Sequence, residues 1–194
     1  MKSKKWTLLA TSLMAMVLMA ACSQSTTTSN TNATTNSATT TATKTNQTSY
    51  FTEKDNDTSY DESTASKIEL SGSSANVSGD GVTVSESTVT ITKSGTYVIS
   101  GQSDGVQIKV EADKSADVHL VLKGATMANT NAAISATSAG HVYLTLAEGT
   151  TNSLSDSSSN SDEKADAALF SKVDLTINGK GTLNVDGKKN NGIK

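Results

Sequence analysis

An alternating apolar pattern that recurs through the second half of the chain constrains the fold most strongly. Val118, Leu120 and Leu122 alternate with residues of the opposite face, and residues 142–146 and 173–177 repeat this alternation. A period of two places the apolar side chains on one face of a strand. Each run is followed within a few residues by glycine, and the chain contains no proline, so every backbone N–H is available to a sheet. The pattern predicts short strands joined by glycine turns.

The spacing of equivalent residues predicts how these strands are arranged. Val118 and Val142 are 24 residues apart, whereas Ile134 and Leu169 are 35 residues apart and Leu169 and Ile193 are again 24 apart. Without about 11 residues of the polar segment 155–165, the longer interval also becomes 24. A repeat of this length without helical periodicity is typical of an all-β solenoid. We expect coils of about 24 residues, with an atypical first unit at 67–102 that caps one end of the core.

Stacking the coils predicts which side chains share a face. We expect three inward apolar ladders: Val118/Val142/Val173, Leu120/Leu144/Leu175 and Leu122/Leu146/Ile177. The same stacking places His119, Tyr143 and Asp174 in one outward column, on coils about 4.8 Å apart. This column is either a shallow sugar-binding face or a set of ordinary solvated side chains. The last residues, 191–194, resemble the opening of a further coil, so we expect a solenoid that is truncated at its C-terminal end.

The N-terminal residues have the pattern of a secretion signal. Lysines at positions 2, 4 and 5 precede the apolar run 6–21, which is too short to span a membrane. The run ends in Ala20-Ala21-Cys22, which resembles the lipobox of bacterial lipoproteins, although Met19 replaces the usual leucine. The alternative is an ordinary signal with a stray cysteine. We expect a signal peptide at 1–21, lipidation of Cys22 and anchoring at the extracellular face of the bacterial membrane.

A polar segment separates this signal from the predicted strands. Residues 23–49 consist almost entirely of Ser, Thr, Asn, Gln and Ala, and cannot bury enough apolar surface to offset their ordering entropy. We therefore expect a disordered linker at 22–66 and a folded domain at 67–194.

The polar insertion between coils contains the best candidate metal site. Asp156, Asp162, Glu163 and Asp166 lie within 11 residues of one another. Clustered oxygen ligands on a loop suit Ca²⁺, which takes six to eight of them. The spacing matches no established calcium loop, so a solvated polar loop is the alternative interpretation.

Several phrases of the sequence resemble a known family. These are residues 95–101 (GTYVISG), 166–171 (DAALFS), 174–183 (DLTINGKGTL) and 191–193 (NGI), together with the lipobox and the polar linker. They are similar to the carbohydrate-binding-domain-containing proteins of Firmicutes and related bacteria. The resemblance covers about residues 67–194 and implies a secreted, right-handed parallel β-helix shaped like a pectate lyase. It also implies binding of cellulosic or acidic plant and cell-wall polysaccharide, including polygalacturonate, with bound calcium.

The remaining composition limits the function classes. The net charge of −3 without basic clusters argues against nucleic acid as a partner. The chain contains no arginine, and its lysines are scattered, so nothing indicates the base and cation that a uronate lyase needs. We therefore expect a non-catalytic polysaccharide-binding module. The alternatives are a structural or adhesive solenoid that binds protein, and a lyase-like enzyme.

Overall fold

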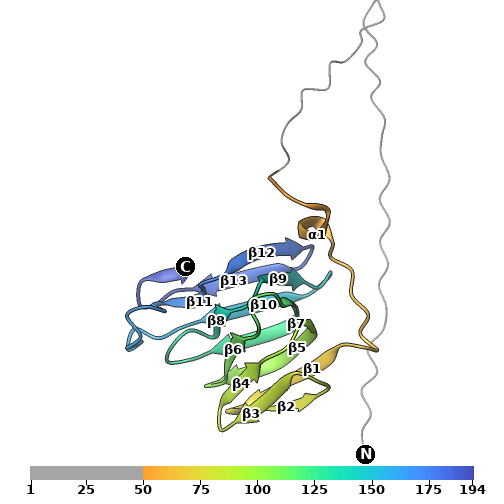
Figure 1. The fold of residues 1–194 in the computed structure, drawn as a ribbon. Coiled ribbons are helices and arrows are strands. Elements are labelled where there is room, and N and C mark those ends of the chain that lie inside the picture. Colours follow the sequence, from red (N-terminus) through yellow and green to blue (C-terminus); the bar gives the residue numbers. More distant parts are fainter. Residues whose placement is uncertain (1–49) are drawn as a thin grey trace, which may run out of the picture. The chain divides into compact units, whose positions relative to one another are not determined.

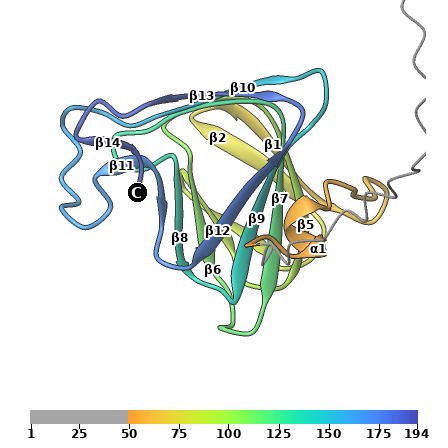
Figure 2. The ribbon, with the colours of Figure 1, turned by 90° about the horizontal axis from the view of Figure 1, so that it is seen from above.

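The protein was analysed as a computed structural model, which describes residues 50–194. These residues form a β-solenoid of about five turns, as the repeat predicts. Seen along its axis, each coil has three sides (Figure 2). The chain climbs from β1 at one end of the solenoid to β12 and β14 at the other (Figure 1).

Each side of the solenoid is a stack of parallel strands. The first side contains β1 (Ser66–Gly72), the first half of β5 (Gly95–Asp104), the first half of β7 (Asp117–Ala128), β9 (His141–Leu146) and β12 (Asp174–Gly179). The second side contains the ends of β5 and β7, with β10 (Thr151–Ser155) and β13 (Thr182–Asp186). The third side contains β4 (Thr88–Ile91), β6 (Gln107–Glu111), β8 (Ile134–Ser138), β11 (Ala167–Ser171) and β14 (Asn191–Ile193).

Two antiparallel strands close the N-terminal end. β2 (Ser74–Ser78) pairs with β1, and β3 (Val82–Ser85) pairs with β4. The first and third sides therefore each end in an antiparallel strand. This is the region where the sequence predicts an atypical first unit. Short antiparallel edge strands end the parallel stack and limit its pairing with other chains.

The inward residues form one continuous core. Val118, Leu120 and Leu122 of β7 are fully buried beside Val142 and Leu144 of β9. The glycines predicted after each run lie where the chain turns a corner. Gly179 has a φ of +99°, and a Cβ at this position would lie 2.3 Å from the carbonyl oxygen of Leu146 on the coil below. Only glycine fits this corner without moving the backbone.

The register of the last inward ladders differs from the prediction. Val118 pairs with Val142 as expected, but Val142 pairs with Leu175, not with Val173. Leu144 likewise pairs with Ile177 rather than with Leu175. Ile134, Leu169 and Ile193 align as predicted on the third side. The apolar pattern determines which face a residue occupies, but a shift of two residues preserves that face and is not visible in the pattern.

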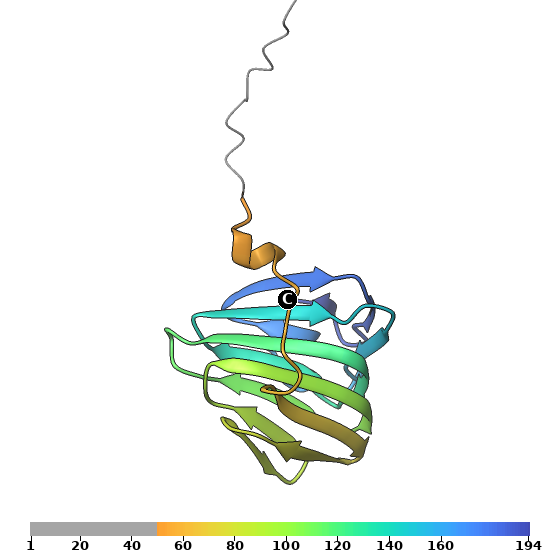
Figure 3. The same ribbon diagram turned by 90° about the vertical axis from the view of Figure 1, so that its right-hand side faces the viewer.

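The segment before β1 is part of the folded unit, unlike the disordered linker predicted to reach residue 66. The helix α1 (Glu53–Asn56) begins at Thr52, whose side chain accepts from the backbone N–H of Asp55 while the Asp55 carboxylate accepts from that of Thr52. This reciprocal capping box stabilises a short helix that has no buried residue of its own. We call residues 52–62 the strap, because they run across the strands of the first side (Figure 3).

Candidate functional site

The outward surface of β7, β9 and β12 carries polar and aromatic side chains that contact the strap. We call this surface the outer face. Its side chains form parallel columns because the strands are in register. One column contains His119, Tyr143 and Thr176, and a second contains Asp117, His141 and Asp174. Val121, Thr145 and Asn178 form a third.

Hydrogen bonds connect these side chains both within a column and between neighbouring columns. Thr145 Oγ1 donates to Asn178 Oδ1 at 2.6 Å, and His119 Nε2 lies 2.7 Å from the same hydroxyl oxygen. Because a threonine hydroxyl has a single proton, His119 Nε2 must be the donor to Thr145. His119 is therefore held with its proton on Nε2.

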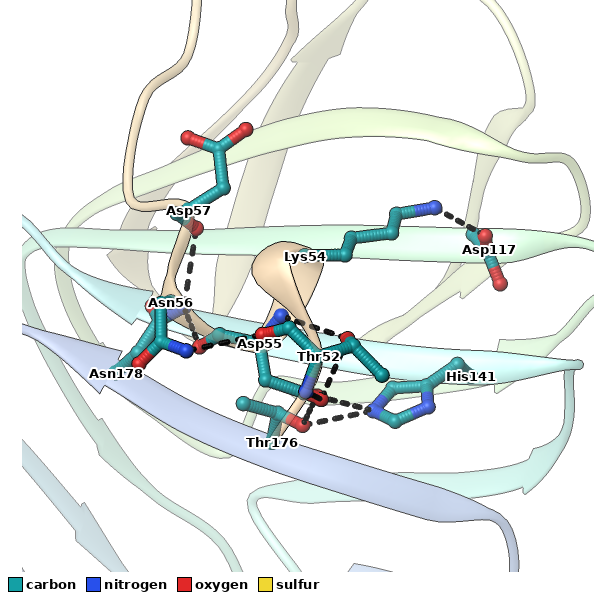
Figure 4. Close-up of polar contacts among 9 residues, drawn as sticks. All are labelled: Thr52, Lys54, Asp55, Asn56, Asp57, Asp117, His141, Thr176 and Asn178. Atoms are coloured by element: carbon teal, nitrogen blue, oxygen red, sulfur yellow. Dashed lines mark hydrogen bonds and ion pairs between the residues drawn. The ribbon is translucent and has the colours of Figure 1, made fainter. Parts of the chain in front are cut away.

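The same logic applies to His141. Thr176 Oγ1 donates to Asp55 Oδ1 of the strap at 2.6 Å, and His141 Nε2 lies 2.8 Å from Thr176 Oγ1. His141 Nε2 is then the donor to Thr176. The Asp55 carboxylate lies 3.8 Å from the same imidazole nitrogen (Figure 4).

Two rings form an aromatic platform in the middle of the outer face. The rings of His141 and Tyr143 are stacked, with centroids 4.1 Å apart and planes inclined by 13°. The ammonium group of Lys54, from the strap, lies over the Tyr143 ring at 5.1 Å from its centroid. Tyr143 is only 8% exposed as a result of this packing, and burial raises the pKa of its phenol.

Polar contacts attach the strap to the outer face. Asn178 Nδ2 donates to the carbonyl oxygens of Asp55 and Asp57, each at 3.1 Å (Figure 4). Lys54 pairs with Asp117, and Lys123 Nζ pairs with Glu62 at 2.7 Å. The strap is therefore attached at several points along its length, mainly through polar side chains and backbone carbonyls, with Tyr60 packed against Val98, Val121 and Ala147.

These contacts change the ionisation of the groups involved. The hydrogen bond from Thr176, followed by those from Thr52, lowers the pKa of Asp55 to about 2. The hydrogen bond to Asp117 raises the pKa of Lys54, and the hydrogen bond from Lys123 lowers the pKa of Glu62. Asp55 and Glu62 of the strap are thus ionised throughout the physiological pH range.

The pKa of His119 gives a testable consequence of the strapped structure. Burial lowers the pKa of His119, and nearby Lys54 lowers it further, while the Asp57 carboxylate acts in the opposite direction. We expect His119 to titrate below the value of about 6.5 found in unstructured peptides. A folded-state pKa below the unfolded value means that the folded state binds fewer protons, so the stability contributed by neutral His119 is complete above pH of about 6.5. It is lost as the pH falls through the folded-state pKa.

The measurement is an NMR pH titration of the imidazole resonances. The protein has two histidines, so a His119→Gln variant assigns both. A His119 pKa at or above 6.5 would contradict the burial described here.

Two cavities lie along the edges of the strap. The first encloses about 230 Å³ and is lined by Lys54, Asp57, Ser59, Gly95, Thr96, Asp117, His119 and Tyr143. The second encloses about 330 Å³ and is lined by Thr58, Tyr60, Lys123, Thr145, Leu146, Ala147, Glu148, Thr150, Gly179 and Lys180. Each has both strap and outer-face residues in its walls, and lysines contribute to both.

Two of the three residues predicted to share an outward column do so, and their role as ligand contacts stays a prediction. His119 and Tyr143 are neighbours on the outer face, but Thr176 completes their column. Asp174 instead pairs with His141, because the true register of β12 is shifted by two residues. His141 is the first residue of β9 and part of the platform.

The strap was not identified from the sequence, although a local signal exists. Thr52 followed three residues later by Asp55 is the spacing of a capping box. That signal indicates a helix start within the segment assigned to the linker. It gives no indication that the helix packs against β12, which lies about 120 residues further along the chain.

In the predicted calcium loop, three of the four acidic side chains have protein partners. Asp156 is 2% exposed and accepts from the backbone N–H groups of Lys188 and Lys189 at 2.6 and 3.4 Å. Asp166 accepts from Asn190 and Lys194, and Asp162 accepts from two backbone N–H groups of its own loop. Glu163 is exposed. Within residues 50–194, no group of three or more His, Cys, Asp or Glu side chains is arranged to hold a metal ion.

The predicted signal peptide, lipidation site and most of the linker lie outside the described residues. Cys22 and residues 1–49 are therefore not placed by the structure. In the part of the chain that the structure describes, no helix is long and apolar enough to cross a membrane.

Comparison with known proteins identifies the family. Residues 85–194, more than half of the chain, match the family described as carbohydrate-binding domain-containing protein. The chain belongs to this family. The resemblance noted from the sequence is thereby confirmed. Within this carbohydrate-binding domain, the matched segment includes β7, β9 and β12, and so the whole outer face, but it excludes the strap.

A solved structure supports the same fold. The polysaccharide lyase-like protein from C. thermocellum, determined as a gadolinium derivative, is similar to this chain with a TM-score of 0.60 and 37% sequence identity. The similarity covers 63% of this chain and 52% of that one, so the chain spans about half the length of its solved relative. No curated protein matches the chain.

Proposed function

We propose that the protein is a non-catalytic, surface-displayed polysaccharide-binding module whose outer face contacts the glycan. The observation that carries this proposal is the position of the His141/Tyr143 platform and the adjoining polar columns inside the segment matched by the carbohydrate-binding family. Sugar rings present apolar faces and ring hydroxyls, which suit an aromatic surface flanked by hydroxyl, amide and imidazole groups. Display at the cell surface rests on the predicted lipidation of Cys22.

Acidic glycans are the favoured ligands within this proposal. Lys123 and Lys180, which belong to the solenoid and not to the strap, border the second cavity. Ammonium groups at the rim of a polar site form charge-assisted hydrogen bonds with carboxylates. A uronate polymer such as polygalacturonate offers one carboxylate per residue to such a surface.

Calcium enters the proposal as a bridge between the 156–166 loop and the ligand carboxylates. For this to occur, Asp162 and Glu163 would have to supply ligands without Asp156, because the buried Asp156 carboxylate holds the backbone at residues 188–189. A Ca²⁺ ion would complete its six to eight oxygen ligands with sugar groups and water. Binding that survives chelation would remove calcium from the proposal and leave the outer face intact as the site.

The central variant is Tyr143→Ala. We expect it to weaken glycan binding by about tenfold, or about 1.4 kcal/mol, because the variant removes the apolar area that a sugar ring would cover on the Tyr143 ring. Binding to polygalacturonate and to cellulose is measured by retention on the insoluble polymer, with calcium and with chelator. Tyr97→Phe is the control, since Tyr97 points into the core and its loss of one hydroxyl leaves the outer face unchanged.

Equal retention of folded Tyr143→Ala and unmodified protein would place the glycan elsewhere. Failure of the unmodified protein to bind any glycan would contradict the proposal as a whole. The lyase-like name of the solved relative makes the enzyme alternative worth testing in the same samples. Accumulation of unsaturated uronates would replace the binding proposal with a lyase.

A further inference from the structure

The platform that the proposed function needs is covered in this structure. A sugar ring stacks on an aromatic side chain only where one face of the ring is accessible. Tyr143 is 8% exposed, with His141 stacked against its ring and the Lys54 ammonium lying over it. A glycan cannot stack on Tyr143 while Lys54 and the strap remain in place.

The strap also occupies the polar groups next to the platform. Thr176 donates its hydroxyl proton to the Asp55 carboxylate, and Asn178 donates its amide protons to two strap carbonyls. Figure 4 shows these side chains of β12 directed at the strap. Carboxylate and carbonyl oxygens of the strap thus take the hydrogen bonds that sugar hydroxyl or carboxylate oxygens would otherwise accept.

We propose that residues 52–62 are an intramolecular occupant of the carbohydrate-binding face, and that a polysaccharide chain binds there when the strap lifts. This inference rests on the proposed function, because it takes the outer face as the glycan site. It adds that the described structure is the closed state of that site.

The way in which the strap is attached makes lifting feasible. No residue of α1 is buried, and the strap contributes no side chain to the main core. Its apolar contact is Tyr60, which packs against the small cluster of Val98, Val121 and Ala147. Ion pairs such as that between Lys123 and Glu62 are roughly half exposed, and exposed pairs contribute little to stability. Segments held in this way open at a small fraction of the free energy needed to unfold the domain.

The solenoid does not need the strap to complete its main core. The family match begins at residue 85, so it includes the outer face without the segment that covers it. Lifting the strap would expose polar groups of the outer face to water, which can satisfy them. The main apolar ladders would keep all their neighbours.

The apparent affinity for glycan should therefore equal the affinity of the open form multiplied by the fraction of molecules in which the strap is open. If the strap is closed in about nine molecules of ten, its removal tightens binding about tenfold. Substitution of a single attachment point should have a smaller effect in the same direction.

The test compares three variants of the chain beginning at Ser23 by calorimetric titration with oligogalacturonides, and with cello-oligosaccharides as a second probe. The first lacks residues 52–62. The second is Asp55→Ala, which removes the carboxylate that accepts from Thr176 and Thr52. The control is Asp104→Ala, which makes the same charge change at an exposed residue near the end of β5, on the second side of the coil.

We expect the deletion to bind about tenfold more tightly than the unmodified chain, Asp55→Ala to bind several-fold more tightly, and Asp104→Ala to be unchanged. Circular dichroism and a cooperative melting transition establish that each variant is folded. If the deletion fails to fold, Asp55→Ala decides the question. Equal or weaker binding by folded strap variants would overturn the inference while leaving the proposed function in place. Absence of binding in every folded form would overturn both.

Discussion

Leu144→Ala is expected to lower the free energy of unfolding by about 2–5 kcal/mol. Leu144 is fully buried in the middle of its inward ladder, between Leu120 on the coil below and Ile177 on the coil above. Truncation removes the transfer free energy of the side chain and leaves a cavity that the neighbouring coils fill only partly. In a solenoid each coil contacts only its neighbours, so the loss is concentrated at the two interfaces of the β9 coil.

Ile177→Ala is the matched control for this effect. Ile177 belongs to the same ladder but is 39% exposed, so we expect a clearly smaller loss of stability. Urea denaturation followed by circular dichroism gives both values. Equal losses for the two variants would contradict the burial and register described for this ladder.

Asn152→Ala is expected to be nearly as damaging, at about 2–5 kcal/mol. Asn152 is fully buried on β10, where its Oδ1 accepts from the backbone N–H of Ala125 at 2.9 Å. Its Nδ2 donates to the Thr150 hydroxyl and to the carbonyl oxygen of Thr182, each at 3.2 Å. Alanine removes the partner of the Ala125 N–H on one coil and of the Thr182 carbonyl on another. Leaving a buried polar group without a partner lowers the free energy of unfolding by about 1–3 kcal/mol.

The control here is Asn184→Ala on the adjacent strand β13, where the asparagine is exposed. We expect its effect on the free energy of unfolding to stay within about 0.5 kcal/mol. Thermal and urea unfolding of both variants checks the prediction. A folded Asn152→Ala variant with unchanged stability would show that water or a rearranged backbone replaces the amide.

The period-two pattern was sufficient to predict the fold class but not the full register. It identified Val118, Leu120 and Leu144 as inward residues and His119 and Tyr143 as outward ones, since this depends only on alternation. It could not align β12, because the insertion between β10 and β11 changes the coil length and a shift of two residues leaves every side chain on the same face. Backbone hydrogen bonds between coils, which the sequence does not display, select Leu175 as the partner of Val142.

The candidate site was predictable to a similar degree. His119 and Tyr143 follow from alternation, whereas His141, Thr176 and Asn178 become partners only when the register of β12 is known. The strap depends on contacts between residues about 120 positions apart, such as Asp55 with Thr176 and Asn178. A segment with few apolar residues is not expected to pack against a folded domain. The contacts between Asp55 and β12 are polar, so the composition of the segment did not reveal them.

The most direct test of glycan binding at the outer face is an NMR titration of the isotope-labelled chain from Ser23 with oligogalacturonides. If the outer face is the site, the largest shifts arise at His119, His141, Tyr143, Thr176 and Asn178, and they are accompanied by shifts in the strap residues 52–62. Shifts confined to the third side of the coil or to the 156–166 loop would contradict this location. Absence of any shift with acidic and cellulosic oligosaccharides alike would contradict carbohydrate binding by this part of the chain.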